Sequence, residues 1–177
     1  MNPRLKSWLQ LAAVLLLVAG AIGFVLNRSA AFRRSGEENA RVWFYDESEK
    51  RLYAAAVDIL PPDKGVGGKK NDGVRAFVVR LAGASKDPRS LRIAYLQTYA
   101  PQLKALLDDA RAARTAGKPF HGQIPARDSD FFQTNTLVRR QDDATWQPSG
   151  TPEAQRITSE WRSWRGPNGQ TPVLTTP

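Results

Sequence analysis

The pattern of hydrophobic and polar positions divides the chain into one long apolar run near its start and several short apolar segments after it. The run, residues 8–26, contains one polar side chain, Gln10, and no charged residue. Its 19 residues, at a helical rise of about 1.5 Å each, match a hydrocarbon core about 30 Å thick. We therefore expect a transmembrane helix over 8–26, a short basic tail over 1–7 and a juxtamembrane linker over 27–41.

The start of the chain also has features of a cleavable export signal. Arg4 and Lys6 precede the apolar run, and the small residues Ala19 and Ala21 have the spacing of a cleavage site. The apolar character continues beyond that site to Leu26, whereas a signal usually turns polar near it. The length of the run favours an uncleaved anchor, and cleavage is the alternative.

The basic residues on the two sides of the run give opposing indications about orientation. Two precede it and four lie in the linker after it, so a count alone places the C-terminal part in the cytoplasm. That topology requires translocation of the basic tail, whereas signal-like N-terminal segments commonly keep such a tail inside and export the rest of the chain. We expect a single-pass cell-membrane protein with an extracytoplasmic C-terminal domain, and a cytoplasm-facing domain is the alternative.

The first short apolar segments after the linker predict strands. Aromatic and β-branched residues on either side of a polar DESEK loop predict a hairpin with strands at 42–46 and 51–56. A loop rich in glycine and lysine comes next, and then a strand is expected at 74–81. The segment 91–99 is compatible with helix or strand. Because Pro101 disfavours helical geometry at Ala100, we assign the segment as a strand and start a helix at Pro101.

Helical signals are clearest in two later segments. Leu103, Leu106 and Leu107 recur at helical spacing, and that helix should end near Gly117. Residues 119–130 are expected to be irregular, and a strand is expected around 136–138. The sequence TPE at 151–153 predicts a second helix, because it supplies a cap oxygen, a proline in the first turn and a favourable charge for the helix dipole. That helix should end by 166, and the tail 168–177 is expected to be extended.

Together these elements predict an α+β fold. An N-terminal transmembrane helix is followed by a globular domain over 42–167, in which a small, mainly antiparallel sheet is covered by two helices. The length after the linker, about 135 residues, suits one domain with a modest core.

Composition and charge exclude several classes of function. The chain contains no cysteine, which rules out disulfides, thiolate nucleophiles and cysteine metal sites within it. The net charge is +9, and residues 1–41 contribute a surplus of four in less than a quarter of the length. Much of the basicity is therefore juxtamembrane, so nucleic acid is not the expected partner. Arg28, Arg33 and Arg34 are candidate contacts to anionic lipid headgroups.

No catalytic or metal-binding motif is present in the sequence. His121 is the only histidine, and one histidine cannot build a His-based metal cage. The glycine-rich segment 65–73 lacks the spacing of a phosphate-binding loop. Paired aspartates at 108/109, 128/130 and 142/143 do not fit a calcium-loop spacing and are interpreted as solvated turn and helix carboxylates. We expect no catalytic residue, no metal and no cofactor.

One aromatic pair is a candidate docking site for a protein partner. Trp161 and Trp164 are three residues apart on one face of the predicted second helix, with Arg162 and Arg165 beside them. An exposed stripe of this composition is typical of protein interfaces. Packing of the two tryptophans in the core is the alternative.

Six short strings, in this order, carry a resemblance to a known family. They are WFYDESEKRLYAAAVDILPP, GVRAFVVR, RIAYLQTYAPQLKALL, LVRRQDDATW, GTPEAQRI and PNGQTP. Over residues 43–172 they resemble a family of uncharacterised, membrane-tethered bacterial proteins. Relatives often place cysteines after the GVRA strand and before the closing PNG, where this chain reads LAGASKDP and SWRGPNG. The resemblance implies a membrane-tethered bacterial protein and supplies a domain boundary, and it brings no activity to transfer.

Three hypotheses about function arise from the sequence. The leading one is a membrane-anchored, non-enzymatic interaction or accessory subunit of a membrane or envelope assembly, whose partners are the lipid bilayer and other membrane proteins. The second is an envelope enzyme with a site built from Asp, Arg and Tyr. The third is a binder of anionic lipid or polymer through Arg28, Arg33, Arg34, Lys69 and Lys70. The sequence leaves the oligomeric state open.

Overall fold

The computed structural model describes residues 40–68, 71–81, 90–166 and 169–177. The chain divides into two units, residues 1–40 and 41–177, and the second unit holds the strands and helices named below. Across the described ranges, no helix combines the length and the apolar character needed to cross a bilayer. The transmembrane helix expected at 8–26 lies outside these ranges, as do the candidate anion contacts Arg28, Arg33, Arg34, Lys69 and Lys70.

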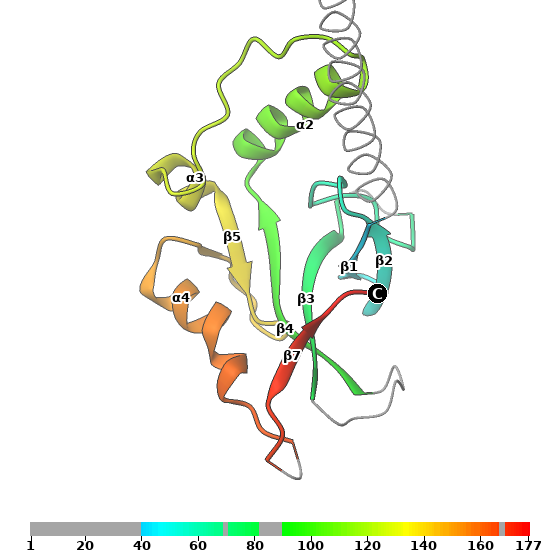
Figure 1. Ribbon diagram of the computed structural model, residues 1–177, viewed down its shortest axis with the longest axis vertical. Coiled ribbons are helices and arrows are strands. Elements are labelled where there is room, and N and C mark those ends of the chain that lie inside the picture. The colour runs from blue at the N-terminus through cyan, green and yellow to red at the C-terminus, as the bar shows by residue number, and fades with distance from the viewer. Residues whose placement is uncertain (1–39, 69–70, 82–89, 167–168) are drawn as a thin grey trace, which may run out of the picture. The chain divides into compact units, whose positions relative to one another are not determined.

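A mainly antiparallel sheet with a few helices forms the described unit, which confirms the predicted α+β class (Figure 1). Six strands lie side by side across the sheet in the order β2-β1-β3-β4-β5-β6, and β7 pairs with β3. The strands are β1 Arg41–Asp46, β2 Arg51–Ala56, β3 Gly73–Leu81, β4 Leu91–Tyr99, β5 Thr136–Arg139, β6 Gln147–Pro148 and β7 Pro172–Thr175.

The predicted hairpin and the two long strands are confirmed. β1 and β2 pair over their full lengths, with Tyr45 opposite Leu52, so aromatic and aliphatic side chains meet across the pair. β3 pairs with β4 from Arg75↔Gln97 to Arg80↔Leu91, with a register shift between Phe77 and Val78. Segment 91–99 is therefore a strand, as the proline argument predicts.

The C-terminal tail, predicted to be extended beyond the domain, contributes the strand β7 to the sheet of the domain. Residues 73–75 of β3 pair with β1, and residues 78–81 of β3 pair with β7 on the same edge. Two short strands thus share one long strand end to end, while β4 occupies the opposite edge of β3. The central strand β3 joins the first hairpin, the C-terminal strand and the rest of the sheet.

Helix α2 Pro101–Thr115 begins and ends where the sequence predicts. Ala100 is extended with φ −63° and ψ 153°, Pro101 occupies the first turn, and Gly117 comes after the helix at a positive φ of 64°. A proline fits the first turn because its missing N–H has no partner there. Glycine tolerates the left-handed conformation that ends a helix.

Two features of the other helices differ from the prediction. Helix α4 Pro152–Ser159 is capped by Thr151, which accepts a hydrogen bond from the N–H of Ala154, but it ends before the tryptophans and continues as the 3-10 helix η2 Glu160–Ser163. A further helix, α3 Asp130–Asn135, precedes β5. The expected total of two helices omitted α3, whose six residues are too few to show an apolar period.

The two faces of the sheet bury separate cores. One face, here called the helix face, packs Val79, Ala94 and Val138 against α4 and η2. The other, here called the curled face, carries Tyr45, Val74, Ala76, Val78 and Leu96, which are all buried. In Figure 1 α4 lies beside one side of the sheet, while α2 lies beyond the end of β4. The described helices therefore leave part of the curled face uncovered.

Candidate binding site on the curled face

Side chains at and just beyond the C-terminal ends of β1 and β5 meet across the curled face. The Gln141 amide donates a hydrogen bond of 3.1 Å to the Tyr45 hydroxyl, and the Arg139 guanidinium pairs with the Glu47 carboxylate. Strands β3 and β4 lie between β1 and β5, so a flat sheet would separate these two strands by about 14 Å. The sheet must therefore curl toward this face. The Arg139 guanidinium also lies 4.7 Å from the centre of the Trp146 ring, which holds Trp146 over the curled core.

A groove of about 510 Å³ lies between the curled face and α2. Val74 and Leu137 of the sheet and Trp146, directly before β6, supply apolar surface, while Lys104 and Ala105 line the groove from α2. We call this cavity the α2 groove. Its size and its combination of apolar surface with a few polar groups are those of small-ligand and anchor-residue pockets.

The α2 groove contains a buried hydroxyl without a partner. Thr98 is only 7% exposed, and its Oγ1 has no hydrogen-bond partner among the described residues. Burying such a group costs about 1–3 kcal/mol. Lys104 is different, because its ammonium donates to the Leu60 carbonyl at 3.2 Å and to the Asp108 carboxylate at 2.8 Å. The α2 groove is therefore lined by the Lys104 ammonium, which has hydrogen-bond partners, and by Thr98, whose buried hydroxyl has none.

Asp46 organises the loops at one end of the sheet. It is fully buried, and one carboxylate oxygen accepts hydrogen bonds from the N–H of Glu49 and from both the N–H and the hydroxyl of Ser48. The other oxygen accepts from the N–H of Gly67. These backbone donors, above all the N–H of Glu49, lower the pKa of Asp46 to about 2. Asp46 is thus a permanent anion at neutral pH that joins the β1–β2 turn to the loop before β3.

A second carboxylate completes this connection. Asp72 accepts a hydrogen bond of 2.8 Å from the N–H of Gly65, and it shares the single proton of the Ser48 hydroxyl, 2.7 Å away, with Asp46. A Cβ at Gly65 would lie 2.2 Å from Oδ2 of Asp46, so only glycine permits this approach. Tyr53 donates to the Lys64 carbonyl, and burial, assisted by the charge of Asp63, raises the pKa of Tyr53 to about 12. The Asp and Tyr side chains of this cluster are engaged in holding the loop.

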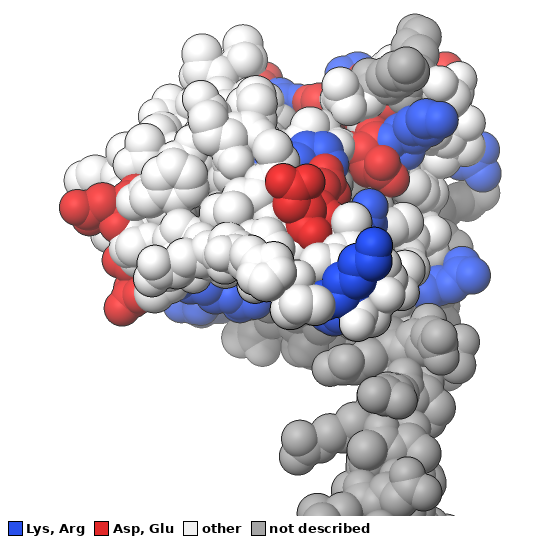
Figure 2. Space-filling view, turned by 90° about the horizontal axis from the view of Figure 1, so that it is seen from above, with Lys and Arg blue, Asp and Glu red and all other residues white. Residues whose placement is uncertain are grey.

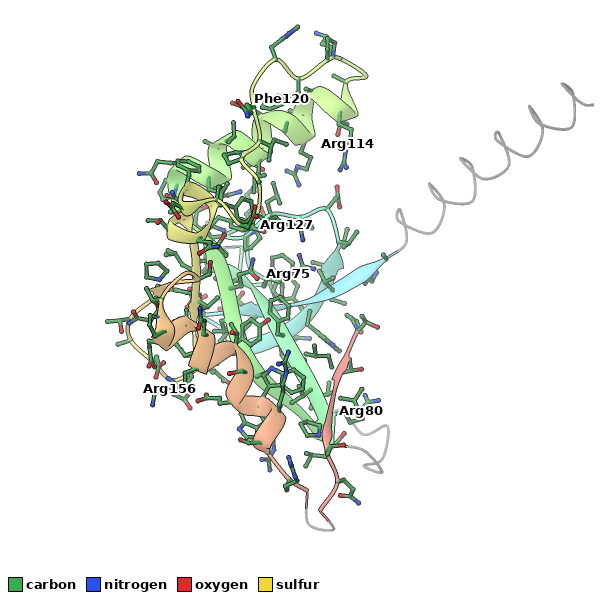
Figure 3. The ribbon with its side chains drawn as sticks, turned by 60° about the vertical axis from the view of Figure 1, so that its left-hand side comes forward. Arg75, Arg80, Arg114, Phe120, Arg127 and Arg156 are labelled. Carbon is green, nitrogen blue, oxygen red and sulfur yellow. The ribbon has the colours of Figure 1, made fainter. Side chains whose placement is uncertain are left out.

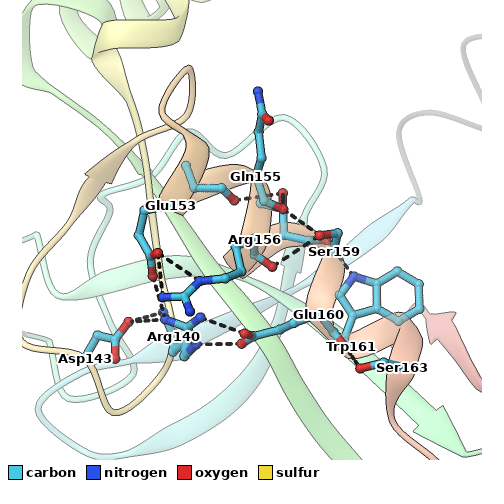
Figure 4. Close-up of polar contacts among 11 residues, drawn as sticks. Arg140, Asp143, Glu153, Gln155, Arg156, Ser159, Glu160, Trp161 and Ser163 are labelled. Carbon is cyan, nitrogen blue, oxygen red and sulfur yellow. Dashed lines mark hydrogen bonds and ion pairs between the residues drawn. The ribbon is translucent and has the colours of Figure 1, made fainter.

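On the helix face, Arg140 connects the helices to the sheet through ion pairs. Its guanidinium binds Glu160 through two hydrogen bonds of 2.6 Å, and it also contacts Glu153 at 3.1 Å and Asp143 at 3.2 Å (Figure 4). Glu160 is the main cause of a raised Arg140 pKa, and Arg140 in turn lowers the pKa of Glu153. The network fastens α4 and η2 to the end of β5.

The structure separates the four members of the predicted docking patch. Trp161 is 9% exposed, packs against Val79 and Ala94, and donates through Nε1 to the Thr158 carbonyl. The core alternative therefore describes Trp161. Trp164 comes directly after η2 and is partly buried. The members that remain exposed are Arg162, stacked 5.5 Å from the Trp161 ring, and Arg165, bonded to nearby carbonyls.

The other sequence candidates lie apart from the α2 groove or belong to ion pairs. His121 is exposed in the irregular segment after α2. Asp108 pairs with Lys104 and Arg111, and Asp143 pairs with Arg140. Within the described ranges, no group of three or more His, Cys, Asp or Glu residues could hold a metal ion. Seen from the α2 end, acidic and basic side chains are interspersed among uncharged ones (Figure 2).

Comparison with known proteins finds no counterpart for this arrangement. No family model, no curated protein and no solved structure matches the chain. Sequence reasoning also missed the residues that shape the curled face, namely Glu47, Thr98 and Arg139. Each looks like an ordinary turn or strand residue, and only the pairing of strands far apart in sequence brings them together.

Proposed function

We propose that the protein is a membrane-anchored, non-enzymatic accessory subunit that binds a partner protein of a membrane or envelope assembly. The apolar run at 8–26 supports the anchor, and the α2 groove supports the binding role. The resemblance to membrane-tethered bacterial proteins fits an inner-membrane location with the domain in the periplasm. The groove would receive an apolar anchor residue of the partner together with a group that hydrogen-bonds Thr98.

The observation that carries the proposal is the unpartnered Thr98 hydroxyl in the α2 groove. Proteins rarely leave a buried hydroxyl unsatisfied, because a partner or a bound molecule usually completes its hydrogen bond. Around it, Val74, Leu137 and Trp146 offer an apolar pocket, which is the environment where interface anchor residues concentrate binding energy. The buried carboxylate of Asp46 is held as an anion by backbone donors, so it is a poor general acid at neutral pH.

Co-purification with a groove-filling variant tests the proposal. The full-length protein is extracted from its native membrane in mild detergent, and the associated proteins are identified by mass spectrometry. Ala105→Trp places a large side chain in the α2 groove, since Ala105 is exposed and lines it. We expect it to reduce recovery of the specific partner at least about tenfold, because a blocked anchor pocket loses about 2 kcal/mol or more.

Ala112→Trp is the matched control. Ala112 is also exposed on α2, about two turns further along and outside the lining of the α2 groove, so the added tryptophan should leave partner recovery unchanged. Equal recovery with both variants, or no reproducible partner with the wild type, would contradict the proposed function. Separately, an alkaline phosphatase fusion at Pro177 should be active, and an inactive fusion would place the domain in the cytoplasm.

A further inference from the structure

The lower part of β4 has an unpaired edge in the described structure. β5 pairs with β4 only from Leu96↔Arg139 to Tyr99↔Thr136, whereas β4 begins at Leu91. Residues 91–95 therefore have β3 on one side and, within the described ranges, no strand on the side of β5. Figure 1 shows β4 continuing past the end of β5. Such an edge presents backbone N–H and C=O groups that pair readily with another extended chain.

A groove of about 530 Å³ lies between the start of β4, which contributes Leu91, Arg92 and Ile93, and the β1–β2 hairpin, with Gln141 and Trp164 also in its lining. Leu91 and Ile93 contact the curled core, while Arg92 lies between them and is exposed. Because side chains alternate along a strand, Arg92 points to the opposite face from its two apolar neighbours. Trp164, a member of the predicted docking set, also lines the groove. We call this cavity the β4-edge groove.

The charged residues described in the lining of the β4-edge groove are basic. Lys50 and Arg92 are both exposed and both line it, and among the described residues its lining contains no carboxylate. The α2 groove differs, because it contains Glu47 and Asp108 beside Lys104. A chain lying in the β4-edge groove would gain from acidic side chains on the Arg92 side and apolar side chains on the side of Leu91 and Ile93.

We propose that the β4-edge groove binds an extended segment of a partner protein in which acidic and apolar residues alternate. The segment adds a strand beside residues 91–95, in line with β5, so that main-chain hydrogen bonds supply affinity and the alternating side chains supply specificity. The inference rests on the proposed function, since it assigns one recognition mode to the accessory subunit. It concerns a different groove from the one that Ala105→Trp fills.

A synthetic peptide tests the proposal directly. The probe is a fluorescein-labelled heptapeptide of alternating glutamate and valine with blocked ends, titrated against the full-length chain in nonionic detergent by fluorescence anisotropy. The same peptide with lysine in place of glutamate should bind at least about tenfold more weakly, because its lysine side chains would face Arg92 as like charges. A version N-methylated on alternate amides should also lose about tenfold, because it cannot form the ladder.

Charge reversal in the protein locates the site. Arg92→Glu should weaken binding of the glutamate peptide about fivefold and strengthen binding of the lysine peptide. Arg114→Glu is the matched control, because it makes the same change of net charge at an exposed residue near the end of α2. Figure 3 shows Arg114 far from Arg80, which pairs with Leu91 at the start of β4. Arg114→Glu should leave both affinities unchanged.

Hydrogen exchange decides between strand addition and other modes of binding. Bound peptide should slow exchange of backbone amides within residues 91–95. Equal affinity for the glutamate and lysine peptides, undiminished binding of the N-methylated peptide, or protection confined to other segments would overturn the proposal. A stable dimer that the peptide does not dissociate would also overturn it, because a second copy would then occupy the edge.

The outcomes separate this inference from the proposed function. If Ala105→Trp abolishes partner recovery while the glutamate peptide fails to bind, strand addition at β4 is wrong and the accessory role stands. If the glutamate peptide binds with the expected preferences while no native partner is recovered, the recognition mode stands and the accessory role is wrong.

Discussion

The helix face and the curled face of the same sheet are closed by different means. On the helix face, α4 and η2 cover the sheet, Ala154 and Ile157 are fully buried, and Arg140 fastens the helices through the carboxylates of Glu153 and Glu160. On the curled face, the curl of the sheet and the ion pair between Arg139 and Glu47 cover only the centre of the face. The α2 groove and the β4-edge groove remain open beside it. The helix face is the more completely packed of the two, and both proposed binding grooves lie on the curled face.

Truncating one isoleucine on each face should give the largest difference in the free energy of unfolding between the two faces. Ile157→Ala should lower the free energy of unfolding by about 3–4 kcal/mol, since Ile157 is fully buried and the packed helix cannot collapse around the cavity. Ile93→Ala on the curled face should cost about 1–2 kcal/mol, because its side chain is only partly buried beside a groove. Urea unfolding of the full chain in nonionic detergent, followed by tryptophan fluorescence, measures both, and equal losses would remove the distinction between the faces.

The second-largest expected change in the free energy of unfolding comes from Asp46, which joins the loops at one end of the sheet. Asp46→Asn should cost about 2 kcal/mol, because an amide cannot accept all four hydrogen bonds as strongly. The pKa of Asp46 is lowered from 3.8 to about 2 in the folded protein, so its contribution to stability is complete above about pH 4 and is lost as the pH falls toward 2.

The pH dependence provides the measurement for this residue. Unfolding free energies of the wild type and of Asp46→Asn, compared at several pH values between about 2 and 6, should converge at the acidic end. A difference between the two proteins that stays constant over that range would show that the carboxylate charge contributes nothing.

The smallest expected effect has the opposite sign. Thr98→Val should raise the free energy of unfolding by about 1 kcal/mol, because it removes a buried hydroxyl without a partner, while it weakens partner recovery. Thr136→Val is the control, since Thr136 is equally buried with an unpartnered Oγ1 but lines neither groove. It should stabilise the protein and leave recovery intact. Stabilisation with unchanged recovery in both variants would remove the binding role of Thr98.

Local signals in the sequence predict most of the elements and little of the site. Pro101 marks the start of α2 and Thr151 caps α4, because both act on backbone groups close to them along the chain. Helix α3 was missed, although Ser129 supplies its cap by accepting from the N–H of Phe132, because six residues carry too little periodicity.

The grooves depend on relations that no local pattern contains. β3 and β4 lie between β1 and β5, so Glu47, directly after β1, and Arg139, at the end of β5, meet only because the sheet curls. The β4-edge groove exists because β5 ends at Arg139, opposite Leu96, whereas β4 begins at Leu91. The first residues of β4 therefore extend past the end of β5. The lengths of β4 and β5 were predicted nearly correctly, but their register was not predicted, and register decides which edge stays unpaired.

The position of β7 on β3 has a consequence for the kinetics of folding. Val79 pairs with Leu174, a residue far later in the chain, whereas the β1–β2 and β3–β4 hairpins join neighbouring segments. Closing such a long loop costs more chain entropy than closing a hairpin, and topologies rich in distant pairings reach the native state slowly. We expect the hairpins to form early and β7 to dock last, which leaves one half of the β3 edge briefly available to other chains during maturation.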